Sequence, residues 1–247
     1  MESLLLKNLY KTEKSIAFDV LAKYKYAHEA VLNIDKIIKE VISKLNEDFI
    51  EIKEGVFVHK SAKVSKSAEL NPPCIIDEGA EIRHGAYIRG NVLIGKGCVV
   101  GNSCELKSAI LYDGACVPHF NYVGNSILGH KAHMGAGAII SNLKSDGSNV
   151  KIDTGSSIFS GASAKTDTGC EKASSSLPKI DTHSRKFGAL VGDHVEIGCG
   201  SVLNPGTVIM PYASVYPLSS VRGLVDENCI YKGKGEIVKR ESLFNKE

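Results

Sequence analysis

The chain has 247 residues, a formal net charge of +2 and an ordinary apolar content of 43%. This length predicts one large domain with a smaller appendage, and the near-neutral charge argues against a surface for nucleic acid or membranes. No apolar run reaches the ~18 residues of a membrane-spanning helix, and the N-terminal apolar stretch is too short for a secretory signal. We therefore expect a cytoplasmic protein.

Residues 1–55 predict a small helical region. Apolar residues in 24–45 follow helical spacing, and shorter apolar patches at 4–10 and 16–21 predict one or two further helices. We interpret this region as a cap on the open end of the domain that follows, as repeat folds need for solubility. A helix that binds a partner or braces a trimer is the alternative.

From residue 56 to the C-terminus, an aliphatic residue recurs at every sixth position over long stretches. The rungs of this ladder are Val58, Val64, Leu70, Ile76, Ile82, Ile88, Ile94, Val100 and Leu106, and later Val191, Ile197, Leu203, Ile209, Val215 and Val221. A six-residue period fits neither an α-helix nor a half-buried strand, and it is typical of a β-helix. Cys74, Cys98 and Cys104 occupy the small position four residues after a rung, which predicts buried small side chains rather than disulfides.

The period is interrupted in three places. It shortens to five residues after Leu106 and after Val123, and it is lost over about 145–190. This stretch is rich in Ser, Gly, Lys, Thr and Asp, which predicts an insertion: an extended arm over a neighbouring subunit, or a mobile loop. The C-terminal tail, from about residue 226, is charged, and we expect it to end in a loop or a helix.

Ionisable residues gather between the interruptions. His119 lies two residues after the rung Val117, so its side chain can leave the wall and accept a proton from an amine or hydroxyl near neutral pH. A lone histidine there is most simply a surface residue. Arg89 and Lys107 recur on nearby turns, however, and supply the charges that a phosphate needs.

Several motifs in this part of the chain resemble a known family. They are AYIRG at 86–90, VVGNSCELKSA at 99–109, HFNYVGNSILG at 119–129, GAGAIISN at 135–142 and, more distantly, GDHVEIGCGSVLNPGTVI at 192–209. They are similar to the acetyltransferase half of the bifunctional N-acetylglucosamine-1-phosphate uridyltransferase/glucosamine-1-phosphate acetyltransferases, and to the β-helices of related archaeal sugar-phosphate nucleotidyltransferase/acetyltransferases. Since no Gly-rich nucleotide loop stands near the N-terminus, we expect no nucleotidyltransferase domain.

The resemblance implies a left-handed triangular β-helix over 56–247 that forms homotrimers with sites between subunits. It also implies an acetyl-CoA-dependent N-acetyltransferase that acts on an amino-sugar phosphate or nucleotide sugar. The acetyl group would pass directly to the acceptor amine, and no metal is required.

The resemblance also assigns roles to residues of the site. His119 matches the general base and Glu105 a carboxylate near the amino sugar. Substrate contacts are implied for Arg89, Lys107, Tyr122, His133 and Asn142, and contacts to the acyl donor for Cys199 and Pro217. His133 departs from the family, which usually has an asparagine there, and Cys199 replaces a serine; the acceptor therefore stays open.

Two other functions are compatible with the sequence. One is a non-catalytic scaffold or sugar-nucleotide-binding subunit. The other is a trimeric zinc enzyme like the β-helix carbonic anhydrases, with His119, His130 and His133, and His84 on an earlier turn, as candidate ligands.

Overall fold

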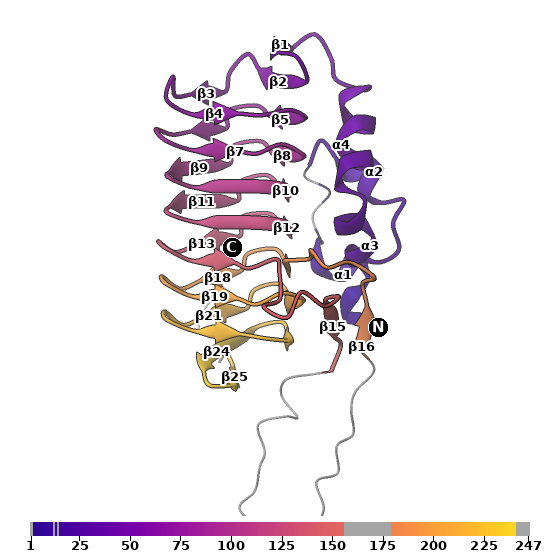
Figure 1. The fold of residues 1–247 in the computed structure, drawn as a ribbon, viewed down its shortest axis with the longest axis vertical. Coiled ribbons are helices and arrows are strands. Elements are labelled where there is room, and N and C mark those ends of the chain that lie inside the picture. The colour runs from indigo at the N-terminus through magenta and orange to yellow at the C-terminus, as the bar shows by residue number, and fades with distance from the viewer. Residues whose placement is uncertain (1, 12, 14, 156–178, 241–247) are drawn as a thin grey trace, which may run out of the picture.

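The computed structural model describes residues 2–11, 13, 15–155 and 179–240 (Figure 1). It confirms the predicted class, since most of these residues form a β-solenoid of about eight turns, consistent with a left-handed β-helix. Both aliphatic ladders point into one continuous core, which also holds Leu111, Leu128, Met134 and Ile140 from the part of the chain where the period shortens. Cys74, Cys98 and Cys104 are fully buried, as predicted.

The solenoid has three faces. The helix face lies beneath the N-terminal helices and comprises β2 (Val56–His59), β5 (Cys74–Ile76), β8 (Val92–Ile94), the second halves of β10 (Glu105–Leu111) and β12 (Tyr122–Leu128), β17 (Ala189–Val191), β20 (Thr207–Ile209) and β23 (Leu224–Val225). The groove face comprises β3 (Lys63–Val64), β6 (Glu81–Ile82), β9 (Val99–Asn102), β11 (Cys116–His119), β13 (His133–Met134), β18 (Glu196–Ile197), β21 (Ser214–Val215) and β24 (Cys229–Gly233). The open face comprises β4 (Glu69–Leu70), β7 (Tyr87–Ile88), the first halves of β10 and β12, β14 (Ile139–Ile140), β19 (Val202–Leu203) and β22 (Ser220–Val221).

Each coil visits the helix face, the groove face and the open face in that order. The strands within each face are parallel, for example Cys116 over Val99 and Tyr122 over Glu105. β10 and β12 are long because each passes directly from the open face to the helix face, which is where the period shortens.

The N-terminal helices lie along the helix face and do not cap the open end, so that part of the prediction was wrong (Figure 1). They are a 3₁₀ turn (Glu2–Leu4), α1 (Leu6–Leu9), α2 (Phe18–Leu21), α3 (Ala27–Leu32) and α4 (Ile34–Ile42). The physical reason is that this face is apolar on its outer side too: Ile75, Leu93, Ile110 and Ile127 point away from the solenoid interior and are fully buried against the helices. None of the described helices is long and apolar enough to span a bilayer.

Asp193 ties the helical segment to the solenoid. Its Oδ2 accepts a hydrogen bond from the backbone N–H of Lys11 at 2.7 Å, and its Oδ1 accepts one from the N–H of His130 at 2.8 Å. Tyr10 adds a second link, since its ring stacks on Tyr112 with 5.0 Å between centroids. The helical segment is therefore fixed to the wall by both polar and apolar contacts.

Antiparallel hairpins close the two ends of the solenoid. β1 (Phe49–Lys53) pairs with β2 at one end, and β25 (Glu236–Lys239) pairs with β24 at the other. The charged tail thus forms a hairpin over 229–239, and its predicted end in a loop or helix lies at 241–247, outside the described residues. An added antiparallel strand satisfies backbone groups that a last parallel strand would leave unpaired.

The ladder is interrupted at the edge between the open face and the helix face. After β14 the chain leaves the coil, forms the antiparallel pair β15 (Lys151–Asp153) and β16 (Lys179–Asp181), and returns at β17. β17 stacks on β12 with Leu190 over Ile127, so the coil resumes in register. The arm or loop predicted within this insertion lies largely at 156–178, outside the described residues.

Candidate active site

His119 is the last residue of β11 and stands at the edge between the groove face and the open face. Its side chain is exposed, and the chain then turns through Phe120, whose φ of 52° lies in the left-handed region. Tyr122 follows as the first residue on the open face. The predicted general base and the predicted aromatic contact thus flank a single corner.

Asn121, which sequence reasoning missed, holds this corner. It is only 2% exposed. Its Oδ1 accepts a hydrogen bond from the backbone N–H of His119 at 3.0 Å, while its Nδ2 donates to the carbonyls of Gly135 at 2.8 Å and Ala138 at 3.0 Å. A buried amide with three partners fixes the backbone that carries His119.

A groove of about 420 Å³ runs along the groove face beside His119. It is lined by Arg83, Val99, Cys116, Pro118, His119, His133, Gly135, Ala136 and Cys199. The structure therefore brings together three of the predicted site residues: His119, His133 and Cys199. His133 Nδ1 lies 2.8 Å from Glu196 Oε2, which makes the carboxylate its hydrogen-bond partner.

Glycine at position 135 allows the coils to approach closely at the floor of this groove. A Cβ there would lie 2.6 Å from the backbone nitrogen of Cys199. Pro217 is exposed one coil further on, where the N–H of Leu218 donates to the carbonyl of Cys199 at 2.9 Å. Pro217 thus continues the line of Cys199 but does not line the groove.

The open face carries a second group of predicted residues. Arg89 Nη1 and Glu105 Oε1 form an ion pair at 2.6 Å, and this hydrogen bond raises the pKa of the guanidinium. Tyr122 stacks above Glu105 in register. Burial, and next the charge of Glu105, raise the pKa of the Tyr122 hydroxyl, which keeps it a neutral donor.

Lys186 is a further cation of this group that the sequence analysis did not identify. It lies in the segment between β16 and β17, where it forms an isolated β-bridge with Leu143, and the next residue's N–H donates to the carbonyl of Asn142 at 3.0 Å. The charge of Lys186, followed by desolvation and by Arg89, lowers the pKa of Lys107. The sequence gives one signal for Lys186: it is a basic residue that stands just before the six-residue period resumes at Val191.

Asn142 connects the open face to the start of the insertion. Its Nδ2 donates to Asn125 Oδ1 at 2.7 Å, which joins two successive corners. The predicted residues therefore form two groups: the groove group of His119, His133 and Cys199, and the open-face group of Arg89, Glu105, Lys107, Tyr122 and Asn142, with Lys186 beside it. The corner at Asn121 lies between the two groups.

The candidate ligands of the alternative zinc site do not all come together within one chain. His130 lies at the edge between the helix face and the groove face, with Nδ1 2.6 Å from the carbonyl of Asp113 and its ring against His194. His119 lies at a different edge. Within the described ranges, no cluster of three or more His, Cys, Asp and Glu side chains is arranged to hold a metal ion.

Part of the chain is similar to known proteins. Residues 70–164 match the model of the GMPPB C-terminal domain. The chain is 32% identical over 114 residues to a bifunctional sugar-1-phosphate nucleotidylyltransferase/acetyltransferase of Sulfurisphaera tokodaii, covering 46% of this chain and 23% of that protein. It is 28% identical over 140 residues to the bifunctional protein GlmU of Methanococcus vannielii, covering 56% of this chain and 28% of that protein.

The resemblance drawn from the motifs is confirmed by these matches. The chain spans about a quarter of the length of these curated relatives. Among solved structures, it aligns with a mutant of AntD, an N-acyltransferase from Bacillus cereus, in complex with dTDP and coenzyme A. That alignment has 20% identity, covers 74% of this chain and 82% of the other, and has a TM-score of 0.37.

Proposed function

We propose that the protein is an acyltransferase that moves an acetyl group from acetyl-CoA to the amine of an amino-sugar phosphate or nucleotide sugar. One observation carries this proposal. A cluster of cations, Arg89, Lys107 and Lys186, with the carboxylate of Glu105 paired to Arg89, lies across one corner from an exposed histidine that borders a groove. Cations held near one another suit a phosphate, and a histidine suits removal of a proton from an amine.

The reaction follows from these positions. His119 takes a proton from the acceptor amine as its nitrogen attacks the thioester carbonyl carbon. A C–N bond forms, the C–S bond breaks, and the proton passes to the departing CoA sulfur. Backbone N–H groups along the coil would stabilise the negative oxygen of the tetrahedral intermediate.

The remaining residues position the two substrates. Arg89, Lys107 and Lys186 hold the acceptor's phosphate, which replaces Glu105 as the partner of Arg89 and frees this carboxylate to contact the amino sugar. Tyr122, Asn142 and His133 contact the sugar. The acyl donor lies along the groove, past Cys199 and Pro217.

We also propose that the chain works as a homotrimer with its sites between subunits. Large apolar side chains are exposed around the corner: Phe120 is 63%, Tyr87 41% and Ile139 39% exposed. Tyr87 and Ile139 occupy the same outward row as Glu105 and Tyr122. Exposed apolar side chains grouped around polar ones favour a protein interface. Light scattering should therefore give about three times the 26.5 kDa of one chain, and a monomer would contradict this arrangement.

The decisive test is acetyl transfer to a panel of amino-sugar phosphates and nucleotide amino sugars, followed by mass spectrometry of the products. A general base contributes ~10²–10⁴-fold, so His119→Ala should lower kcat/KM by at least about 100-fold. His84→Ala is the matched control, because His84 is an exposed histidine at the same edge, two coils away. If wild type and His119→Ala are equally inert yet bind a nucleotide sugar, the protein is a sensor or scaffold instead.

A further inference from the structure

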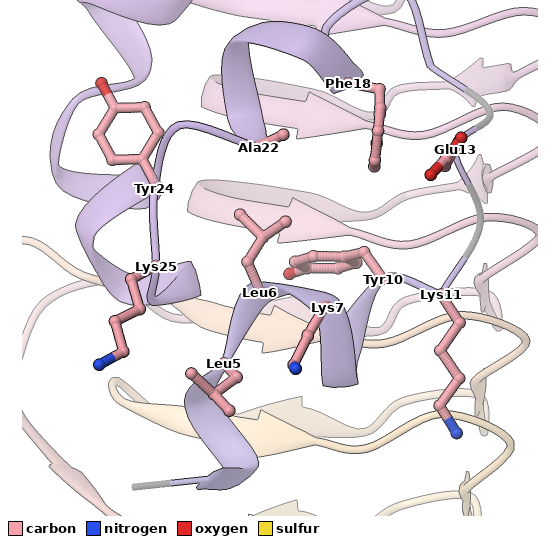
Figure 2. A pocket seen from close by; sticks show the side chains of 10 residues that line it. All are labelled: Leu5, Leu6, Lys7, Tyr10, Lys11, Glu13, Phe18, Ala22, Tyr24 and Lys25. Carbon is pink, nitrogen blue, oxygen red and sulfur yellow. The ribbon is translucent and has the colours of Figure 1, made fainter.

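A second hollow, of about 520 Å³, lies among the N-terminal helices (Figure 2). Its lining comes entirely from residues 5–25, so it shares no residue with the candidate active site. The middle of the pocket is apolar, with Leu6, Tyr10, Phe18 and Ala22 around it. Its volume falls within the ~300–1,000 Å³ typical of small-molecule sites.

The floor of this helical pocket is held rigidly. Leu6 is 5% and Tyr10 2% exposed. The Tyr10 hydroxyl donates to the carbonyl of Ile127 on β12 at 3.3 Å, and its ring stacks on Tyr112 of the solenoid wall with the two planes 14° apart. Since the wall of the solenoid holds the floor, the pocket is formed before any ligand arrives.

The rim of the pocket is polarised. Lys7 and Lys25 lie on one side of the apolar centre, whereas Glu13 lies on the other side, beyond Phe18 (Figure 2). Neither Lys7 nor Lys25 forms an ion pair with any carboxylate of the described residues, while Lys11 is already paired with Glu227. One side of an apolar pocket therefore presents two ammonium groups without an ion-pair partner among the described residues, and the Nζ of Lys25 lies 5.2 Å from the centroid of the Tyr26 ring.

We propose that this pocket binds a small amphiphilic anion, with a carboxylate or phosphate head between Lys7 and Lys25 and an apolar body over Leu6, Tyr10 and Phe18. The apolar body gains from leaving water, and the head gains from two cations at the edge of a low-dielectric surface. This site is separate from the proposed acyl transfer and stands whether or not that activity is found.

Ligand binding can be followed by the fluorescence of one introduced tryptophan, because the chain contains no tryptophan of its own. Phe18→Trp places the chain's single tryptophan in the pocket, where it can be excited selectively beside the tyrosines. Dodecanoate, dodecyl phosphate, dodecanol and dodecyltrimethylammonium are then titrated below their micelle concentrations. Saturable binding of one anion per chain is expected, and the two anions separate a carboxylate ligand from a phosphate ligand. Calorimetry on the unchanged chain replaces fluorescence if Phe18→Trp unfolds.

Charge selectivity decides the outcome. Two ion pairs at a partly shielded rim predict that each anion binds about tenfold more tightly than the alcohol or the cation. Lys7→Ala with Lys25→Ala should remove this preference, whereas Lys36→Ala, at an exposed lysine of α4, should keep it. Ala22→Phe should block all four probes by filling the hollow. The proposal is overturned if dodecanol binds as tightly as dodecanoate, if nothing binds saturably, or if the double variant matches Lys36→Ala.

Discussion

Asn121→Ala should destabilise the protein more than any other exchange of a single polar side chain at the corner of the site. The side-chain amide makes three N–H···O hydrogen bonds, with the N–H of His119 and the carbonyls of Gly135 and Ala138, and it is almost completely shielded from water. A buried hydrogen bond contributes about 1 kcal/mol net, so the loss amounts to about 3 kcal/mol. In a chain of this size that lowers Tm by about 6–12 °C.

Thermal unfolding followed by circular dichroism measures this loss, with all variants at one protein concentration because assembly shifts Tm. Asn102→Ala is the matched control. Asn102 pairs with His119 in register at the same edge, but it is only half-buried and its Nδ2 makes one bond, to the carbonyl of His84 at 2.9 Å. Its replacement should cost less than about 1 kcal/mol. If both variants melt at the same temperature, Asn121 does not hold the corner as argued.

Three further predictions concern the helix face, the cation cluster and the cysteines. Ile110→Ala, which empties a fully buried site beneath the helices, should cost about 2–5 kcal/mol in urea unfolding. Lys186→Met should raise the pKa of Lys107 toward its ordinary 10.5, because a neighbouring positive charge is removed; NMR titration of the amine measures this. A thiol reagent at pH 8 should label Cys199, which is exposed, but not Cys74, because burial raises the pKa of this thiol to about 12.

Each of these predictions has a result that would contradict it. Ile139→Ala, at an exposed isoleucine of the open face, is the control for Ile110→Ala, and equal losses would argue against burial by the helices. Lys179→Met changes an exposed lysine of β16, and an equal shift there would mean that Lys186 is not the neighbour of Lys107. Labelling of Cys74 at the rate of Cys199 would mean that the first coils open readily.

The inner side of the solenoid could be predicted from sequence because each rung obeys a local six-residue rule. The placement of the helices could not be predicted, because the six-residue period describes only the side chains that point inward and says nothing about those on the outer side of the solenoid. The missed signal lay in strands whose three residues are all apolar or small, such as Val92–Ile94 and Ala189–Val191. A strand buried on both faces reads as a continuous apolar run, and these runs mark the face that the helices cover.

The residues of the candidate site likewise include some that could be predicted from the sequence and some that could not. Residues inside short motifs, such as His119 and Arg89, could be singled out from spacing and resemblance. Asn121 could not, because its partners Gly135 and Ala138 belong to the next coil and come near only when the coils stack. Lys186 stands more than forty residues beyond Asn142, and its proximity depends on how the insertion returns to the solenoid.

The way the chain returns to the solenoid has a consequence for how the chain could be altered. The chain leaves the solenoid after Ile140 and rejoins it at Ala189, with Leu190 stacked on Ile127 as though the coil had never been broken. Whatever length of chain joins those two points, the order and number of rungs stay the same. A segment of another length could therefore be placed at this position without changing the stacking of the coils. Under the proposed function, such a change beside Lys186 should alter which acceptor the protein accepts.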